Sequence, residues 1–199
     1  MTAVRRLVLA SGNRGKLVEL RGILAPLDMD LVAQSDLGID DVEETGLSFI
    51  ENALLKARNA ARASGLPALG DDSGLCVDAL GGAPGLYSAR YAGPHGDAGA
   101  NIAKLLDALH DLPADARTAH FHCTLVLLRS ADDPAPLIAE GRWHGRILDA
   151  PRGSGGFGYD PVFLDPEFGV SAAELDPQMK NRVSHRAQAL ALLNRLLAG

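Results

Sequence analysis

The chain is poor in cysteine and in aromatic residues. Its 199 residues include two cysteines, and aromatic residues make up 5% of the chain. Cys76 and Cys123 lie far apart, each within an apolar stretch, and neither belongs to a C-x-x-C pair or has a neighbour at a metal-ligand spacing. We therefore expect two buried free thiols rather than a cysteine-based metal or redox site.

Long apolar runs are also absent. No stretch of eighteen apolar residues occurs, so the sequence contains no candidate for a membrane-spanning helix. The first apolar run, Leu7 to Ala10, is too short for the hydrophobic region of a secretory signal. We expect a cytoplasmic protein with no membrane partner.

An excess of positive charge is missing as well. The chain has 19 Lys and Arg against 25 Asp and Glu, a net charge of −6. Binding to a nucleic acid polymer depends on a basic surface that neutralises phosphates, so a polymer is disfavoured and an RNA-binding module is the weakest functional hypothesis. A small anionic ligand held by a few local cations remains compatible with this balance.

The composition and the order of patterns indicate one globular domain, residues 1–199, of the α/β type. Hydrophobic residues make up 47% of the chain and charged residues 22%. Apolar periodicity predicts strands at 6–10, 29–34, 75–80, 86–91 and 120–127, a strand or hairpin at 137–148, and helices at 17–24, 48–63, 102–109 and 185–197. Strands and helices in this order favour a mixed sheet over a purely parallel one.

The stretch Gly70-Asp71-Asp72-Ser73-Gly74 is the first candidate for chemistry. Two carboxylates and a hydroxyl lie between glycines, just before the apolar run at 75–80. Carboxylate oxygens are hard ligands that suit Mg²⁺, and small neighbours let a ligand approach closely. The alternative is an ordinary turn, because Asp, Ser and Gly are common turn residues.

A second candidate, Ser11-Gly12-Asn13-Arg14-Gly15-Lys16, connects the first predicted strand to the first predicted helix. Such a loop can present backbone N–H groups and the positive helix end to a phosphate, and Lys16 adds a full charge. A Walker A motif is excluded, because its G-x-x-x-x-G-K-[ST] spacing is absent. A loop with a simple helix cap is the alternative.

An acidic loop precedes the second predicted helix. Glu43 and Glu44 belong to it and could add an oxygen ligand to a metal held by Asp72, or could form a solvated surface. Ser48 and Glu51 have the spacing of a capping box, which predicts a helix that ends at Gly65. On this helix Lys56 either extends to solvent or points inward at a phosphate or carboxylate.

Two later segments are candidates for ligand contacts. The glycine-rich loop 151–161 carries Phe157 and Tyr159, and an aromatic ring offers a flat base a surface for stacking; a loop packed by its own rings is the alternative. Ser184 is a plausible N-cap, which places His185 and Arg186 in a first helical turn. Cations there oppose the helix dipole, which is easier to understand if an anionic or hydrogen-bonding ligand binds at that helix start.

His120 and His122 share one face of a predicted strand, as in some metal sites. No third histidine or thiolate has a diagnostic spacing, so a transition-metal site is disfavoured.

Taken together, these segments resemble the inosine triphosphate pyrophosphatase family, bacterial type, whose members are also described as dITP/XTP pyrophosphatases. The similarity runs from about residue 7 to the C-terminus with the motifs in family order. The motifs are S-G-N-x-x-K (11–16), E-E-T-G (43–46), S-F-I-E-N-A-L-L-K-A (48–57), D-D-S-G-L (71–75), G-G-A-P-G-L-Y-S-A-R-Y (81–91), G-G-F-G-Y-D-P-V-F (155–163) and S-H-R (184–186).

The resemblance implies an activity and an architecture. Members cleave purine nucleoside triphosphates such as ITP, dITP and XTP between the α and β phosphates, which releases the monophosphate and pyrophosphate and clears deaminated purines from the nucleotide pool. It also implies Mg²⁺ dependence, a homodimer, and a long curved mixed β-sheet with flanking helices and two lobes around a central cleft.

The resemblance further implies roles for individual residues. Asp72 matches the proton acceptor and metal ligand, and either Glu43 or Glu44 matches the second acidic ligand. Substrate contacts are implied for Ser11, Gly12, Asn13, Arg14, Gly15, Lys16, Lys56, Ser73, Phe157, Gly158, Tyr159, Asp160, Lys180, His185 and Arg186.

The implied mechanism uses the alternation of strand residues. If Asp71 and Asp72 are extended, only one can face the ligand, and we assign that position to Asp72, with Asp71 supporting it from behind. Selectivity is expected from a donor to the purine 6-keto oxygen, such as Arg186 or a backbone N–H. Two rival functions stay open: a Maf-like pyrophosphatase for modified pyrimidine triphosphates, and a non-catalytic nucleotide sensor.

Overall fold

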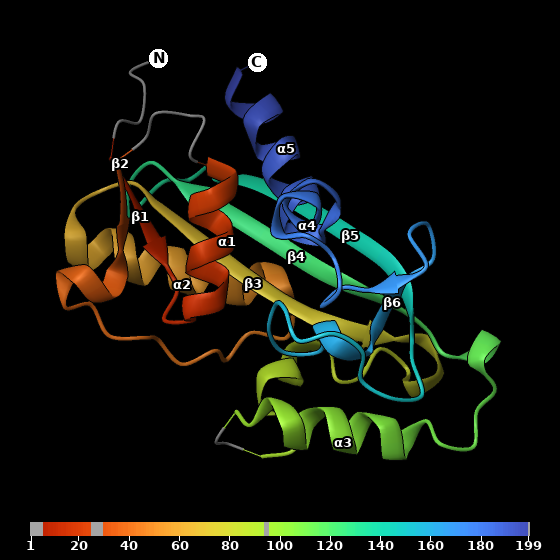
Figure 1. Cartoon of the computed structure of the whole chain (residues 1–199). Coiled ribbons are helices and arrows are strands. Elements are labelled where there is room, and N and C mark those ends of the chain that lie inside the picture. Colours follow the sequence, from red (N-terminus) through yellow and green to blue (C-terminus); the bar gives the residue numbers. More distant parts are fainter. Residues whose placement is uncertain (1–5, 25–29, 94–95, 199) are drawn as a thin grey trace. The chain divides into compact units, whose positions relative to one another are not determined.

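The computed structural model describes residues 6–24, 30–93 and 96–198, and its elements form a mixed α/β arrangement (Figure 1). Seven strands form one sheet in the order β2-β1-β3-β4-β5-β6-β7. β1 pairs in parallel with both β2 and β3, whereas β5–β6 and β6–β7 are antiparallel. The prediction of a mixed sheet with helices is therefore confirmed.

The bounds of the regular elements are as follows. The strands are β1 (Arg6–Ala10), β2 (Asp30–Ala33), β3 (Ala68–Val77), β4 (Thr118–Leu128), β5 (Leu137–Ile147), β6 (Phe163–Asp165) and β7 (Val170–Ser171). The α-helices are α1 (Arg14–Leu24), α2 (Phe49–Ser64), α3 (Ala98–Ala108), α4 (Pro177–Val183) and α5 (His185–Ala198). Short 3-10 helices include η2 (Gln34–Leu37), η3 (Asp78–Leu80), η4 (Gly85–Arg90), η5 (Ala114–Ala116) and η6 (Asp160–Val162).

The chain divides into two compact units. The first unit comprises the chain up to Asp72 together with Cys123–Gly141 and the segment from His185 onward. The second comprises Ser73–His122 and Arg142–Ser184. The strands β3, β4 and β5 contribute residues to both units. Each unit has its own core.

In the first unit, helices cover the strands of the sheet with apolar side chains. Leucines of α1 and α5 pack with residues of β1, β3 and β4 in one cluster, which includes Leu20, Leu190 and Leu125. The small side chains of α2 pack with β1 in a second cluster and with β4 in a third. Alanines allow α2 to lie close to the strands, and the carbonyl oxygen of Ala53 occupies the space that a Cβ on Gly70 would need.

The second unit has an aromatic core. Phe163 lies between Phe121 and Trp143, with ring centroids 4.6 and 5.0 Å away. These distances fall in the range of favourable offset or edge contacts between rings. The Trp143 indole N–H donates to the Asp165 carboxylate at 2.7 Å, so the buried polar atom of this ring is satisfied.

Several sequence predictions are confirmed in detail. The Ser48 hydroxyl accepts from the Glu51 N–H, and Gly65 ends α2 in the left-handed conformation, as the capping pattern predicts. β1 has the predicted bounds, and Leu137 to Ile147 forms one strand. Both cysteines are free thiols; Cys123 is buried, whereas Cys76 is only partly buried. Of the predicted strand 29–34, Met29 lies outside the described residues.

The structure contradicts two of the predicted strands. The D-D-S-G stretch precedes no strand at 75–80; it lies inside β3, which ends at Val77 and is followed by η3. Residues 86–91 were predicted as a strand, but Gly85–Arg90 is the 3-10 helix η4. Pro84 at its start and the side-chain bonds of Ser88 within it favour a turn over extended backbone.

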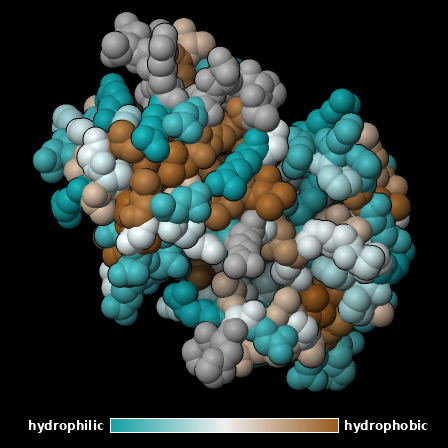
Figure 2. Space-filling model, turned by 60° about the vertical axis from the view of Figure 1, so that its left-hand side comes forward, coloured by the Kyte–Doolittle hydropathy of each residue, from teal (hydrophilic) through white to brown (hydrophobic). Residues whose placement is uncertain are grey.

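Apolar residues are also found at the surface. Figure 2 shows a band of hydrophobic residues on the face turned to the viewer, flanked by hydrophilic ones. In the first unit the exposed large apolar side chains include Val18, Leu37, Leu47 and Ile50. No helix within the described ranges is both long and apolar enough to cross a membrane.

His120 gives the second unit a testable pH dependence. Its ring lies 5.5 Å from that of His144 and 6.4 Å from that of His122. Burial, followed by the charges of His144, Arg142 and His122, lowers the pKa of His120, and Asp78 only partly opposes this.

Within the described residues, no group of three or more His, Cys, Asp or Glu side chains is arranged to hold a metal.

Because the folded chain binds a proton at His120 less readily than the unfolded chain, stability is expected to fall as the pH drops below about 6.5. Urea unfolding at pH 7 and pH 5.5 measures this loss, which should be smaller in His120→Gln. Equal losses in wild type and His120→Gln would contradict the assignment.

Candidate active site

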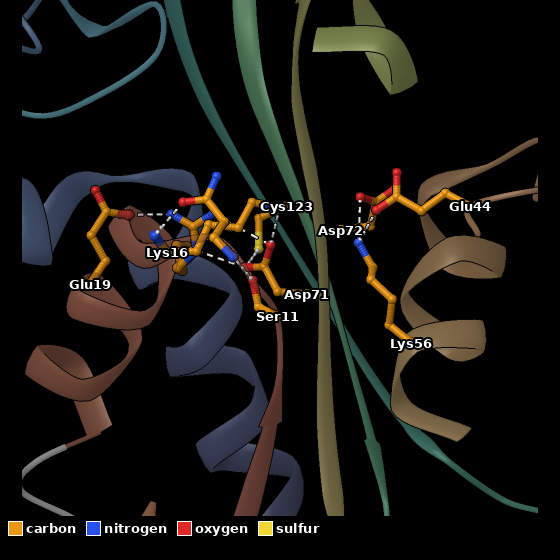
Figure 3. A network of polar contacts seen from close by, with 10 residues as sticks. Ser11, Lys16, Glu19, Glu44, Lys56, Asp71, Asp72 and Cys123 are labelled. Carbon is orange, nitrogen blue, oxygen red and sulfur yellow. Dashed lines mark hydrogen bonds and ion pairs between the residues drawn. The ribbon is translucent and has the colours of Figure 1, made fainter. Parts of the chain in front are cut away.

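Asp71 and Asp72 occupy consecutive positions of β3 and point to opposite faces of the strand (Figure 3). This is the alternation that extended backbone imposes. Both side chains are buried, with exposed fractions of 1% for Asp71 and 5% for Asp72. Each face holds its own group of charged residues, so the two carboxylates have different chemical surroundings.

Asp71 is the centre of a buried ion-pair network. Its carboxylate accepts from Arg186 Nε at 2.7 Å and contacts Lys16 Nζ at 2.8 Å. The Cys123 thiol donates to the same carboxylate at 3.5 Å. Arg186 also pairs with Glu19 of α1, so its guanidinium joins two carboxylates.

The charges in this network stabilise one another. Burial opposes the charge of Asp71, but Arg186 and Lys16 outweigh it and hold the pKa of the carboxyl well below its usual range. Burial likewise opposes the charge of Arg186, and Asp71 and Glu19 raise its pKa in return. Burial and the Asp71 charge raise the pKa of the Cys123 thiol, which therefore stays protonated as a donor. Asp71 and Arg186 are thus a fixed charged pair.

Asp72 lies on the other face, where it shares one ammonium group with Glu44. Lys56 Nζ is 2.9 Å from Asp72 Oδ1 and 2.8 Å from Glu44 Oε1. Lys56 comes from α2 and Glu44 from the acidic loop before it, so the helix side chain links that loop to β3 (Figure 3). Of the two earlier alternatives for Lys56, the inward orientation is the one observed.

Lys56 only partly offsets the effect of burial on Asp72. Burial alone would lower the pKa of Lys56, but Asp72 and Glu44 together raise it. Burial raises the pKa of Asp72, and Lys56 and Lys16 only partly offset that effect. Asp72 Oδ2 is buried and makes no hydrogen bond among the described residues. An unsatisfied carboxylate oxygen of this kind is suited to a cation or a water molecule.

The residues around Asp72 fit a magnesium ion. Asp72 offers a buried carboxylate oxygen with no hydrogen-bond partner among the described residues, and Glu44 of the acidic loop contacts the same lysine. Oxygen donors without sulfur or imidazole are the set that Mg²⁺ prefers, and Mg²⁺ usually takes only one or two carboxylates and keeps several waters. Glu44 lies next to Lys56, whereas the neighbouring Glu43 is exposed.

The loop between β1 and α1 lies on the Asp71 side. The Ser11 hydroxyl accepts from the Asn13 N–H at 3.2 Å, and the Asn13 side chain accepts from the Lys16 N–H at 3.1 Å, as a helix cap does. These bonds orient the first turn of α1 so that Lys16 contacts Asp71. Gly12 is exposed and Gly15 partly buried, and the Arg14 side chain lies outside the described residues.

The second unit holds the glycine-rich loop. The Asp160 carboxylate accepts from the Phe157 N–H at 2.7 Å and from Lys180 Nζ at 2.6 Å. Lys180 Nζ also lies 5.0 Å from the centre of the Phe157 ring, a cation–π distance. Tyr159 is 5% exposed, and its hydroxyl donates to the Ser88 carbonyl oxygen at 2.9 Å. Phe157 and Gly158 are partly buried, between the exposed residues 151–156 and the buried Tyr159 and Asp160.

The structure brings the predicted residues into two groups. In the first unit Ser11, Asn13, Lys16, Glu44, Lys56, Asp72 and Arg186 belong to the loops and networks around β3. His185 is buried at the start of α5. In the second unit Phe157, Asp160 and Lys180 contact one another, and Ser73 is a partly buried residue of β3.

Sequence reasoning missed some participants. Glu19 was not predicted, although it lies three residues after Lys16 on α1 and so shares its helix face. Cys123 was treated only as a buried thiol, and its strand alternation gave no sign of a bond to Asp71. Ser88 was quoted within a motif but given no role.

The fold and the site define an α/β protein in which two buried carboxylates of one strand are held by lysine and arginine side chains. Residues 7–196 match the model of the Ham1 family, and the chain belongs to that family. The dITP/XTP pyrophosphatase of Xanthomonas campestris pv. campestris (strain 8004) is 64% identical over 194 residues, which cover 98% of each chain. The dITP/XTP pyrophosphatase of Shigella flexneri is 57% identical over 96% of each chain.

Solved structures agree with this assignment. A HAM1 protein from Coxiella burnetii is 49% identical, with a TM-score of 0.88 over 97% of this chain and 98% of that one. The Staphylococcus aureus Ham1 protein is 40% identical, with a TM-score of 0.85 over 98% of both chains. The fold described above is therefore that of the Ham1 family.

Proposed function

We propose that the protein is a dITP/XTP pyrophosphatase that converts nonstandard purine nucleoside triphosphates such as ITP, dITP and XTP to the monophosphate and pyrophosphate. The observation that carries the proposal is the buried, incompletely compensated Asp72 carboxylate beside Lys56 and Glu44. Relatives that share 57–64% of its residues over nearly the full chain bear that description. In the cell it would act in the cytoplasm as a homodimer of a two-lobed domain and clear deaminated purines from the nucleotide pool.

The residues of the first unit bind the triphosphate in this proposal. The Ser11–Lys16 loop ends at the N-terminus of α1, where backbone N–H groups and the helix dipole favour an anion. Lys16 and Lys56 already contact carboxylates and add electrostatic stabilisation for phosphate oxygens. Asp71 and Arg186 hold Lys16 and the start of α5 in place from within the unit.

The chemical step depends on Asp72. Magnesium would be held by Asp72 and by either Glu43 or Glu44, and when bound it would offset charge on the phosphate oxygens. Burial raises the pKa of Asp72, which makes its carboxylate a stronger proton acceptor than an exposed one. Asp72 therefore orients the attacking water and accepts its proton, while Lys56 stabilises the anionic groups around it.

The residues of the second unit bind the base. Phe157 is partly buried and offers its ring for stacking. The buried Tyr159 instead supports the loop, through packing and its hydroxyl bond. A donor to the purine 6-keto oxygen accounts for a preference for hypoxanthine and xanthine over adenine, because a mismatched donor would be left unpaired. Arg186 is fully buried between Asp71 and Glu19, so a backbone N–H of the loop is the better candidate for that donor.

A substrate panel tests the proposal. Pyrophosphate release from ITP, dITP, XTP, GTP and ATP is measured with Mg²⁺ and after chelation, with a modified pyrimidine triphosphate included. The expected result is a kcat/KM for ITP and XTP at least about tenfold above that for ATP, with activity lost after chelation. Comparable values for ITP and ATP would contradict the selectivity. Tight binding of ITP without turnover would favour a sensor, and preference for the pyrimidine would favour a Maf-like enzyme.

A further inference from the structure

The G-G-A-P-G-L-Y-S-A-R-Y stretch contains a residue with an unassigned role. Ser88 lies in η4 and is 8% exposed, although its neighbours Tyr87 and Ala89 are exposed. A buried hydroxyl between exposed residues needs partners within the protein. Those partners lie in two other segments of the second unit.

Ser88 uses both its hydroxyl and its carbonyl group. Its Oγ accepts from the Leu75 N–H of β3 at 2.9 Å and donates to the Gly85 carbonyl oxygen at 2.6 Å. Its carbonyl oxygen accepts from the Tyr159 hydroxyl at 2.9 Å. One residue thereby connects β3, three positions after Asp72, with the loop that carries Phe157.

The glycine of D-D-S-G makes this connection possible. A Cβ on Gly74 would collide with the Gly85 carbonyl oxygen and would lie 2.7 Å from Ser88 Oγ. Because Gly74 has no side chain, η4 can pack directly against β3. This gives Gly74 a packing role rather than a ligand-binding one.

Tyr159 is held by burial in the core of the second unit and by its hydroxyl bond to Ser88. Burial, with a smaller contribution from Tyr91, raises the pKa of Tyr159, so its hydroxyl remains a donor at physiological pH. The opposite side of the loop is fixed independently, through the bonds of Asp160 to the Phe157 N–H and to Lys180. Loss of the Ser88 contact would leave Tyr159 held by packing alone, without a hydrogen bond that orients its ring.

We propose that Ser88 is a positioning residue. Through its bond with Tyr159 it fixes the position of the base-binding loop, residues 157–160, and thereby determines substrate affinity and base selectivity. The inference rests on the proposed function, because it assumes that Phe157 to Asp160 contact the base. It assigns Ser88 no part in the chemical step, since its bonds all go to protein atoms.

Kinetics of Ser88→Ala, Tyr159→Phe and the double variant test the proposal. Each single variant is expected to raise KM for ITP about five- to tenfold and to reduce the ITP-over-GTP ratio of kcat/KM, with kcat within about twofold of wild type. Tyr159→Phe removes the bond to the Ser88 carbonyl oxygen, and Ser88→Ala removes the Oγ bonds that hold this carbonyl in place. Because both changes act on one chain of contacts, the double variant should resemble the more affected single variant. Tyr87→Phe is the matched control: this exposed ring is adjacent in η4, and the variant should keep wild-type kinetics.

Amide hydrogen exchange provides a readout that does not require catalysis. In the nucleotide-free protein, Ser88→Ala and Tyr159→Phe are expected to accelerate exchange at residues 157–160, whereas Tyr87→Phe is not. Unchanged exchange at these residues in Ser88→Ala would overturn the proposal even if no substrate were turned over. A lower melting temperature with unchanged KM and selectivity, or a fall in kcat at constant KM, would also overturn it. Absence of ITP hydrolysis by the wild-type protein would contradict the proposed function instead.

Discussion

Asp72→Asn is expected to reduce kcat for ITP by about 10²–10⁴-fold while the protein stays folded. The amide keeps the size of the carboxylate but cannot accept a proton, and it is a poor ligand for Mg²⁺. The loss should appear in kcat more than in KM, because the triphosphate contacts from Lys16 and the β1–α1 loop remain. Steady-state kinetics with saturating Mg²⁺ measure the effect, and the circular dichroism spectrum verifies the fold.

The control for this variant is an aspartate without a role in the site. Asp107 is exposed on α3, and Asp107→Asn should have wild-type kinetics. A fall of less than about tenfold in Asp72→Asn would contradict both the proton-acceptor and the metal-ligand role.

Asp71→Asn is expected to have the largest effect on stability. It would leave the fully buried Arg186 without its main partner, and removing one member of a buried ion pair costs about 3–5 kcal/mol. Glu19 still contacts Arg186, so the guanidinium keeps part of its compensation. The free energy of unfolding from urea titration measures the loss.

An exposed pair in the same unit provides the comparison. Arg21 of α1 and Asp36 of η2 are 3.3 Å apart with side chains 49% and 59% exposed. Asp36→Asn should therefore cost less than about 1 kcal/mol. If Asp71→Asn costs no more than Asp36→Asn, the Asp71–Arg186 pair is not the stabilising centre that its burial indicates.

Local signals explain which parts of the fold could be predicted. The helix at 49–64 follows from Ser48, Glu51 and Gly65, whose capping roles depend on neighbours within four residues. β1 and β4 follow from apolar patterns of sufficient length. The segment at 85–90 was mistaken for a strand because the hydroxyl of Ser88, not apolar alternation, determines its local structure.

The sequence named several residues that the structure brings together around β3, but not the contacts between them. Asp72 and Lys56 were chosen from their motifs, and the structure adds that Lys56 contacts Asp72 and Glu44 together. The bond between Asp71 and Arg186 joins residues 115 positions apart, and no local pattern encodes such a pair. The prediction that Arg186 contacts the nucleotide also relied on charge at a helix start alone, which does not reveal a buried partner.

Product analysis of a single reaction tests the central claim most directly. The protein is incubated with ITP and Mg²⁺, and the products are followed by phosphorus NMR. The account predicts one inosine monophosphate and one pyrophosphate for each ITP consumed, with no inosine diphosphate at any time. Accumulation of inosine diphosphate and inorganic phosphate would show cleavage at the γ phosphate and would contradict the assignment of this chain as a pyrophosphatase.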